Sequence, residues 1–400
     1  MITSTTLDVR ADFPFLTRIV NGKPIVYFDN AATTQKPSCV LRSIQDLYTA
    51  GISNVHRAVN FLAAEVTGQF EESRSTIASL LGAHAREVIF VNNTTHAINV
   101  VANSLSQGKP LRVLASTLEH HSNLLPWTQR GKLDLIPWNP SQGIDLDVLE
   151  RELGTHPGLV AITQASNFLG TTQPVREIGA LCRKHNVPFF VDASQSIAHE
   201  PINVRELGCD YLAFSGHKMY GPGGIGVLYV SDEQIGQLSP LLFGGNMVKE
   251  VHAETFVMND IPHRFEAGTP NIEGVIGLGA AVRFLSAIGY PAIAAHERDL
   301  VQYAKRGMRS IPCTELFGPA DSHGAPLVSF QIKGLDSGAV AKALAARANV
   351  IVRSGFHCAQ PAHEELGIGP TVRASFGIYN TLSEIDSMLD VTKSLTRVLR

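Results

Sequence analysis

The stretch FSGHKMYGPGGIGVLYV, residues 214–230, decides the fold because it joins two apolar runs through a glycine-rich turn that carries one lysine. The runs DYLAF (210–214) and GVLYV (226–230) are too close together for a helical crossover. We therefore expect one of the two strands to run antiparallel. A lysine is costly to bury. The position of Lys218 at the end of an apolar strand, where it would be buried, therefore needs an explanation.

Further apolar runs precede this stretch, and amphipathic segments separate them. None of the runs shows strict polar alternation, which is typical of strands buried on both faces of a mostly parallel sheet. After the first run, apolar side chains recur at helical spacing from Ile98 to Leu105. The pattern predicts an α/β fold with a mostly parallel sheet. The additional runs are EVIFV (87–91), LRVLA (111–115), LVAIT (159–163) and VPFFV (187–191).

The pattern changes near EAGTPN, residues 266–271. From there on, long helical segments alternate with few strands, which indicates a smaller α+β domain. We predict a large domain at 16–268, and a small domain formed by 1–15 and 269–400. The segments behind this prediction are helices at 273–288, 337–347 and 383–399, with strands at 327–332, 349–352 and 372–376.

Composition excludes several classes of function. The chain has 400 residues, is 44% hydrophobic and carries a formal net charge of -3, without blocks of like charge. These values favour a globular protein and give no sign of a nucleic-acid or membrane partner. No apolar run reaches the roughly 18–20 residues of a membrane span, and the N-terminus lacks the pattern of a signal peptide, so we expect a cytoplasmic protein. Five widely spaced cysteines argue against a disulfide framework and a zinc site, and we predict no metal.

Burial lowers the pKa of a lysine and makes its amine a nucleophile, which can form a Schiff base with pyridoxal phosphate (PLP). A surface lysine in a glycine hairpin is the alternative for Lys218.

The cofactor also needs a carboxylate at its pyridine nitrogen. Asp192 directly follows the run VPFFV, at the carboxyl end of a strand, where open α/β sheets bind ligands. Gln195 could reach the ring hydroxyl. An ordinary helix cap is the other interpretation of Asp192.

A phosphate group needs hydrogen-bond donors. Thr94 and Thr95 fall at an expected helix N-terminus, where free N–H groups favour an anion, although threonine also serves there as a simple cap. Ser215 and His217 stand beside the lysine and could add contacts.

Two further segments carry candidate chemistry. The pair His120 and His121 could provide an imidazole over the cofactor ring. A metal pair and an exposed loop are the alternatives. Adjacent residues of a strand point to opposite faces, which argues against a shared metal.

Cys358 lies in the polar loop RSGFHCAQP with Arg353 nearby, and a neighbouring cation favours the thiolate. The thiol could also be incidental. Arg373 could bind a substrate carboxylate.

In this order, these stretches resemble the class V aminotransferase-like group of fold-type I PLP enzymes, and within it the Suf-type and Csd-type cysteine desulfurases, also called selenocysteine lyases. The resemblance covers nearly the whole chain and implies a large domain with a mostly parallel, seven-stranded sheet and a smaller α+β domain. The segments that carry it are YFDNAATTQKP (27–37), NVHR (54–57), TTHAINVVA (94–102), EHHSNLLPW (119–127), SNFLGT (166–171), VDASQS (191–196), FSGHKMYGPGGIGVLYV (214–230), RFEAGTPN (264–271), RSGFHCAQP (353–361) and RASFGIYNT (373–381).

The resemblance implies a role for each matched residue. Lys218 matches the Schiff-base lysine, and Cys358 the nucleophile that accepts sulfur as a persulfide. The remaining matches are Asp192 at the pyridine nitrogen, Gln195 at the ring hydroxyl, His121 stacked on the ring, Thr95, Ser215 and His217 at the phosphate, Thr269 at the phosphate of the other subunit, and Asn167, Arg353 and Arg373 at the substrate.

The implied activity is conversion of L-cysteine, selenocysteine or cysteine sulfinate to alanine by a homodimer, with sulfur passed to an acceptor protein, as in iron–sulfur cluster assembly. A PLP-dependent C–S β-lyase and a non-catalytic sulfur-transfer partner are the alternatives. The chain departs from the family pattern at Asn93, where a glycine is usual, at Phe356 before the cysteine motif, and at FGGN (243–246).

Overall fold

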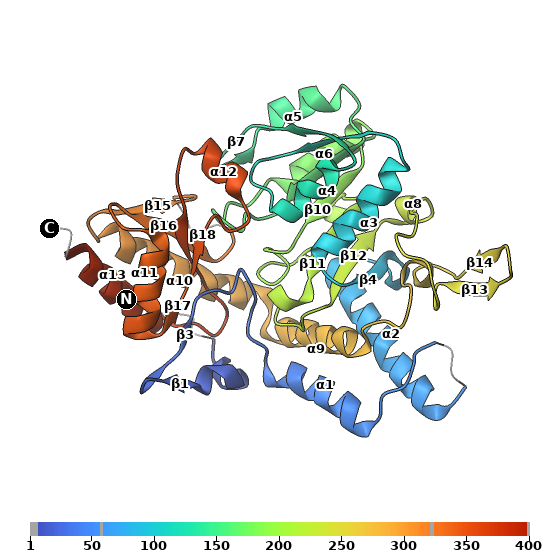
Figure 1. Cartoon of the computed structure of the whole chain (residues 1–400), viewed down its shortest axis with the longest axis horizontal. Helices are drawn as coiled ribbons and strands as arrows, with labels where there is room; N and C mark the ends of the chain where they lie inside the picture. Colours follow the sequence, from blue (N-terminus) through green and yellow to red (C-terminus); the bar gives the residue numbers. More distant parts are fainter. Residues whose placement is uncertain (1–6, 57–58, 321–323, 398–400) are drawn as a thin grey trace.

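The computed structural model describes residues 7–56, 59–320 and 324–397. Its centre is one seven-stranded sheet, and the smaller C-terminal part lies beside it (Figure 1). The strand order is β4 (Val88–Val91), β12 (Gly226–Val230), β11 (Tyr211–Ser215), β10 (Phe189–Asp192), β9 (Leu159–Thr163), β5 (Leu111–Ala115) and β6 (Gly131–Leu135).

Strand β12 runs antiparallel to both of its neighbours, and the other neighbouring strands are parallel. This confirms the predicted seven strands and the antiparallel member. The exposed edge strand β6, with the sequence GKLDL, has no buried residue, and so it carries none of the apolar signal that marks the inner strands.

Both faces of the sheet are covered, as the continuous apolar runs require. In β10, Phe189 and Val191 pack into one core with α2 (Phe61–Leu81), α6 (Val175–Lys184) and α9 (Ile272–Ile288). Phe190 points to the other face and packs with Trp127 and with α3 (Thr94–Ser106). The helices and 3₁₀ turns that complete this part are α1 (Ser38–Ala50), α4 (Leu125–Thr128), α5 (Leu146–Leu153), α7 (Val204–Leu207), α8 (Asp232–Ile235), Arg10–Asp12, Pro14–Thr17, Ala85–Glu87, η4 (His121–Asn123), η5 (Gly216–Lys218) and His263–Phe265.

The smaller part is an antiparallel sheet, β15 (Thr314–Phe317), β16 (Leu327–Ile332), β19 (Thr371–Ser375) and β18 (Arg353–Gly355). Residues of α10 (Tyr290–Arg309), α11 (Ser337–Ala348) and α13 (Leu382–Arg397) share a second core with it, and α12 (Gln360–Glu365) follows the cysteine loop. The remaining short pairs are β1 (Ile19–Val20) with β2 (Lys23–Pro24), β3 (Val26–Tyr27) with β17 (Val350–Ile351), β7 (Trp138–Asn139) with β8 (Gly143–Ile144), and β13 (Val248–Val251) with β14 (Phe256–Met258).

Packing across the expected domain boundaries differs from the sequence pattern. Helix α9 belongs to the core of the large sheet, although we placed it in the small domain. Val26 and Phe28 pack in the second core, although we placed them in the large domain. The boundaries at 15 and 268 therefore remain predictions, and this packing favours later ones. Residues 1–6 of the N-terminal segment, Arg57 of the motif NVHR, and residues 398 and 399 of the final helix lie outside the described residues.

Among the described helices, no single one has the length and apolar character to cross a membrane; α9 and α10 pass that test only as a pair bent by 80°.

Arg74 and Glu266 form an ion pair in the interior of the described structure. Arg74 on α2 donates to Glu266 at 2.7 and 2.9 Å, and both side chains are almost fully buried. Burial alone would raise the pKa of Glu266, but the charge and hydrogen bonds of Arg74, together with hydrogen bonds from His263 and Phe90, lower the pKa.

Replacing Arg74 with Met removes the guanidinium partner of the buried Glu266, so we expect a loss of about 3–5 kcal/mol in the free energy of unfolding. Urea denaturation at fixed protein concentration measures it. The double variant Arg74→Met/Glu266→Gln should recover much of the loss, and the exposed Arg283→Met should change little. A loss below about 1 kcal/mol in Arg74→Met would contradict this account.

Candidate functional site

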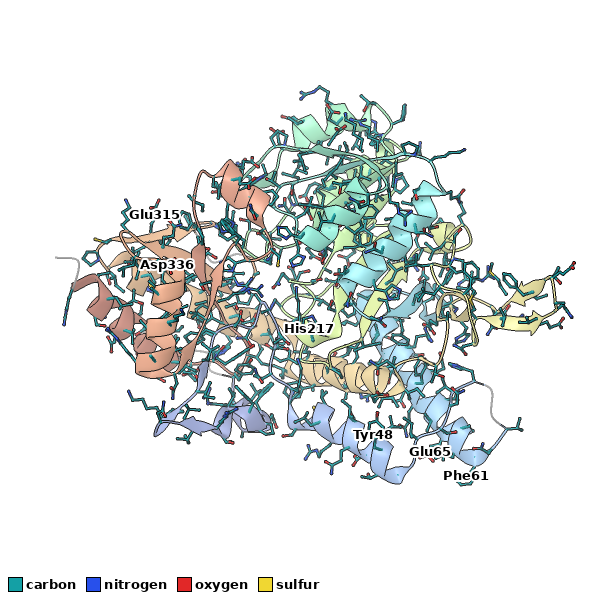
Figure 2. The ribbon with its side chains drawn as sticks, in the orientation of Figure 1. Tyr48, Phe61, Glu65, His217, Glu315 and Asp336 are labelled. Atoms are coloured by element: carbon teal, nitrogen blue, oxygen red, sulfur yellow. The ribbon has the colours of Figure 1, made fainter. Side chains whose placement is uncertain are left out.

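Most of the predicted site residues meet in one cavity. It has a volume of about 270 Å³ and lies at the ends of β10 and β11, where the small part meets the sheet. His217, one of its lining residues, lies between the two parts (Figure 2). The predicted residues that line the cavity are Thr94, Thr95, Asn167, Asp192, Ser215, His217, Lys218, Arg353, Cys358 and Arg373.

Lys218 ends the 3₁₀ turn η5 directly after β11. Its burial lowers the pKa of its amine; Asp192 opposes this effect and Arg373 adds to it. The lysine is therefore more easily deprotonated than one in water. Such an amine can act as a nucleophile or as a base near neutral pH.

Asp192 is held as a carboxylate acceptor at the end of β10. Its side chain is 3% exposed, and Oδ1 accepts the N–H of Ser194 at 2.9 Å. It faces the same cavity as Lys218. A buried acid at this place can bind a protonated ring nitrogen.

Hydroxyl groups gather at the N-terminus of the 13-residue helix α3. Thr94 Oγ1 lies 2.8 Å from Ser194 Oγ and 2.9 Å from Ser215 Oγ. Asn93 caps the helix, because its Oδ1 accepts the N–H of His96 at 2.9 Å, and this explains how an asparagine serves where the family usually has glycine. Hydroxyl donors at a helix N-terminus suit a phosphate.

We predicted His121 at the cofactor ring, but of the histidine pair it is His120 that lines the cavity. His121 lines a separate hollow with Leu125 and Gln129, and its Nε2 accepts the N–H of Gln360 at 3.4 Å. The two side chains diverge because His120 has an extended backbone and His121 begins a 3₁₀ turn.

The protonation state of His120 follows from its surroundings. Its Nδ1 accepts the N–H of Ser122 at 3.1 Å, so the neutral ring carries its hydrogen on Nε2. Burial, and then the charge of Lys218, lowers its pKa to about 3. The ring therefore offers one N–H donor at neutral pH.

Two further predicted residues lie outside the cavity lining. Gln195 is buried, donates to the carbonyl of Ala31 at 2.8 Å and lines an adjoining cavity. Thr269 is exposed, just before α9. Its role toward another subunit stays a prediction.

The cysteine loop has an unusual backbone. His357 and Cys358 both have positive φ, 53° and 58°, which non-glycine residues rarely adopt. Anchors hold this conformation: Asn167 Nδ2 donates to the carbonyl of His357 at 2.5 Å, and the N–H of His121 donates to the carbonyl of Cys358 at 2.9 Å. Arg353 Nη2 lies 4.0 Å from Cys358 Sγ and brings a positive charge to the sulfur.

Arg373 is 1% exposed and held from two sides. Nη1 donates to the carbonyl of Asn167 at 2.7 Å, and Nη2 to Asp29 at 3.2 Å. Burial lowers its pKa to about 10, against the opposing effect of Asp29. Its Nε is buried and lacks a hydrogen-bond partner among the described residues, which fits an anionic ligand in the cavity.

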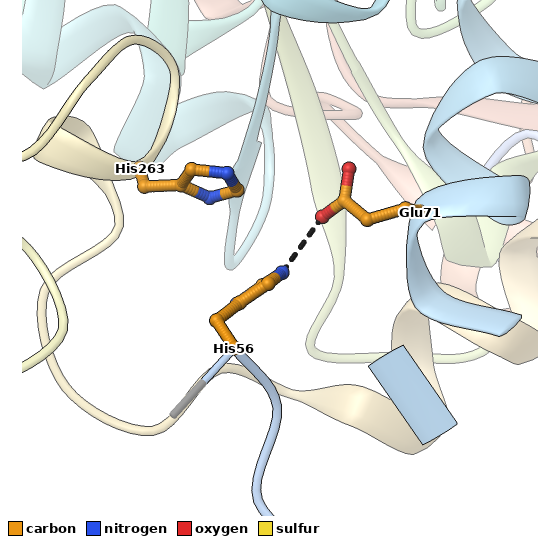
Figure 3. Close-up of side chains that lie close together, drawn as sticks. All are labelled: His56, Glu71 and His263. Atoms are coloured by element: carbon orange, nitrogen blue, oxygen red, sulfur yellow. Dashed lines mark hydrogen bonds and ion pairs between the residues drawn. The ribbon is translucent and has the colours of Figure 1, made fainter. Parts of the chain in front are cut away.

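Outside the cavity, His56, Glu71 and His263 bring their ligand atoms within 4.8 Å of one another (Figure 3). His56 Nε2 lies 2.9 Å from Glu71, but Arg74 Nε also donates to this carboxylate at 3.0 Å. The guanidinium already supplies the positive charge that a metal would bring. We interpret the cluster as an ion-pair network.

Sequence reasoning named the pair His120 and His121 but assigned the ring contact to His121, and it missed Ser194, which lines the cavity, and the buried Glu119. Glu119 accepts the N–H of Thr163 at 2.6 Å and the amide of Asn123 at 2.7 Å, and burial raises its pKa to about 8. The motifs contained these residues, but position in a motif does not say which side chains face the cavity.

Comparison with known proteins places this geometry in a family. The model of the aminotransferase class-V family matches residues 26–388. A cysteine desulfurase of Klebsiella pneumoniae is 39% identical over the full length of both chains. The chain belongs to the cysteine desulfurase family of the class-V aminotransferases. Two solved cysteine desulfurases have the same fold. The apo enzyme of Thermococcus onnurineus has a TM-score of 0.93 and 37% identity, with 98% of each chain covered. CsdA of Escherichia coli in its S-sulfonic acid form has a TM-score of 0.88 and 33% identity, with 97% of this chain and 98% of that chain covered.

Some cysteine desulfurase relatives are longer than this chain. The probable cysteine desulfurase 1 of Mycobacterium leprae is 43% identical over 97% of the chain, which spans 64% of that protein's length.

The neutral state of His120 can be measured by NMR on histidine-labelled protein. The lowered pKa predicts that this ring keeps its hydrogen on Nε2 and does not titrate between pH 5 and 8. In the unfolded chain this histidine takes up a proton below about pH 6.5, whereas in the folded protein it stays neutral down to about pH 3. Lowering the pH through this range therefore favours the unfolded chain and lowers the free energy of unfolding. His120→Gln should remove that part of the acid dependence, and His121→Gln serves as the neighbouring control. A His120 midpoint near 6.5 would contradict the assignment.

Proposed function

We propose that this protein is a PLP-dependent cysteine desulfurase. It converts L-cysteine to L-alanine and leaves the sulfur as a persulfide on Cys358, for transfer to an acceptor protein. The observation that carries the proposal is that the Lys218 amine, the Cys358 thiol and the guanidinium groups of Arg353 and Arg373 share one cavity with Asp192.

The residues present fit pyridoxal phosphate. Lys218 would bind it covalently, Asp192 would face its ring nitrogen and His120 would lie at the ring. The hydroxyl cluster of Thr94 and Ser215, with Thr95, Ser194 and His217, would hold the phosphate. When bound, the cofactor supplies an electron sink for charge that develops at the substrate's α-carbon.

The chain's own groups would do the remaining work. Arg373 binds the substrate carboxylate through its charged guanidinium. The amine of Lys218 takes the proton from the α-carbon. Sγ of Cys358 bonds to the substrate sulfur as the carbon–sulfur bond breaks; the electron pair stays on carbon, which takes up a proton. Among the groups that line the cavity, the protonated amine of Lys218 would supply that proton, and His120 Nε2–H would donate a hydrogen bond.

Further parts of the proposal rest on the family. Selenocysteine and cysteine sulfinate are candidate substrates, and iron–sulfur cluster assembly is the candidate destination of the sulfur. We also propose a cytoplasmic homodimer in which Thr269 reaches the partner's cofactor, with no nucleic-acid or membrane partner.

The test is incubation with L-cysteine, quantification of alanine and pyruvate, and mass mapping of any persulfide. We expect alanine, with the extra sulfur on Cys358. Cys358→Ser should keep the bound chromophore and lose alanine formation by about a hundredfold or more, because the nucleophile is gone. Cys313→Ser, which removes an exposed thiol, is the matched control.

Pyruvate as the main product, or full activity in Cys358→Ser, would contradict the persulfide step and support a C–S β-lyase. Absence of any turnover in a chromophore-bearing protein would support the non-catalytic alternative.

A further inference from the structure

The backbone carbonyl of His217, directly before Lys218, is the meeting point of several donors. It accepts the N–H of Thr34 at 3.0 Å and the hydroxyls of Thr33 and Thr34 at 3.1 Å each. Lys36 Nζ donates to the same oxygen at 3.0 Å. All of these donors come from residues 33–36, far from Lys218 in sequence.

The amine of Lys36 donates hydrogen bonds to two backbone carbonyls. Besides the carbonyl of His217, Nζ donates to the carbonyl of Thr34 at 2.5 Å. The side chain is half-buried, and burial lowers its pKa to about 8. A charge-assisted hydrogen bond of this kind is stronger than a neutral one, so Lys36 is the strongest of the donors on this oxygen.

The other side of Lys218 is fixed by the same segment. Tyr220 has a φ of 66°, which is strained for a bulky residue, and its N–H donates to Thr34 Oγ1 at 2.8 Å. The hydroxyl of Tyr220 accepts the N–H of Ile378 at 3.1 Å. The backbone is therefore held at residue 217 and again at residue 220, on both sides of the reactive lysine.

We propose that Lys36 is a positioning residue for Lys218: by binding the carbonyl of His217 it holds the turn η5 so that the amine of Lys218 points into the cavity. The anchoring stands on contacts within this chain, and its effect on turnover rests on the proposed function. Lys36 acts through the backbone and does not itself line the cavity.

The test compares Lys36→Met with Lys23→Met. Lys23 is a matched control because its Nζ also donates to a backbone carbonyl, that of Arg347 at 2.9 Å, on the exposed surface. Hydrogen exchange of the purified protein should show the amides of Thr34 and Tyr220 exchanging at least about tenfold faster in Lys36→Met, and unchanged in Lys23→Met. This readout does not depend on turnover.

Steady-state kinetics with L-cysteine gives the second readout. Because a displaced amine slows the chemical step more than binding, kcat should fall about ten- to a hundredfold in Lys36→Met with KM nearly unchanged. Lys36→Arg keeps the cation and should recover most of kcat.

A lower melting temperature with unchanged exchange at Thr34 and Tyr220 and unchanged kcat would show a purely structural role and overturn the proposal. Equal effects of Lys36→Met and Lys23→Met would overturn it as well. If the wild-type protein shows no desulfurase activity, the proposed function fails, while the exchange measurement still decides whether Lys36 anchors the turn.

Discussion

The removal of one amine from water is the constraint on which the rest of the structure depends. Lys218 stands where β11 ends, and its burial lowers its pKa. Burying an amine costs folding free energy, and a chemical function of that amine explains why the chain retains it. The antiparallel strand β12 pairs with β11, so Lys218 lies in the short connection at the C-terminal end of β11.

The charges around this amine explain what the cavity can bind. Arg353 and Arg373 bring cationic groups beside the Lys218 amine, and Asp192 brings one carboxylate. With the hydroxyls at the start of α3, such a cavity favours ligands that carry phosphate and carboxylate groups. The strained backbone at Cys358 presents a thiol to the same space, and Asn167 links the anchoring of this loop to Arg373.

Much of the fold could be predicted from the sequence because the inner strands are buried on both faces and read as continuous apolar runs. The edge strand β6 is largely exposed and its sequence is mostly polar, so it shows no apolar run. Helix α9 packs in the core of the large sheet, and its sequence did not indicate this, because an apolar helix shows that it is buried but not which elements it packs against. The two histidines differ for a related reason: a turn at His121 decides which ring faces the cavity, and the order of residues does not reveal it. Contacts between distant segments, such as Lys36 with the carbonyl of His217, lie beyond local patterns altogether.

The central claim is that Lys218, and no other amine, holds the cofactor. Borohydride reduction of the protein with bound pyridoxal phosphate fixes the cofactor to its lysine, and peptide mass mapping then identifies that residue. The account predicts the pyridoxyl group on Lys218 alone. A label on Lys36, the neighbouring amine whose pKa is lowered to about 8, or on surface lysines without preference, would contradict it.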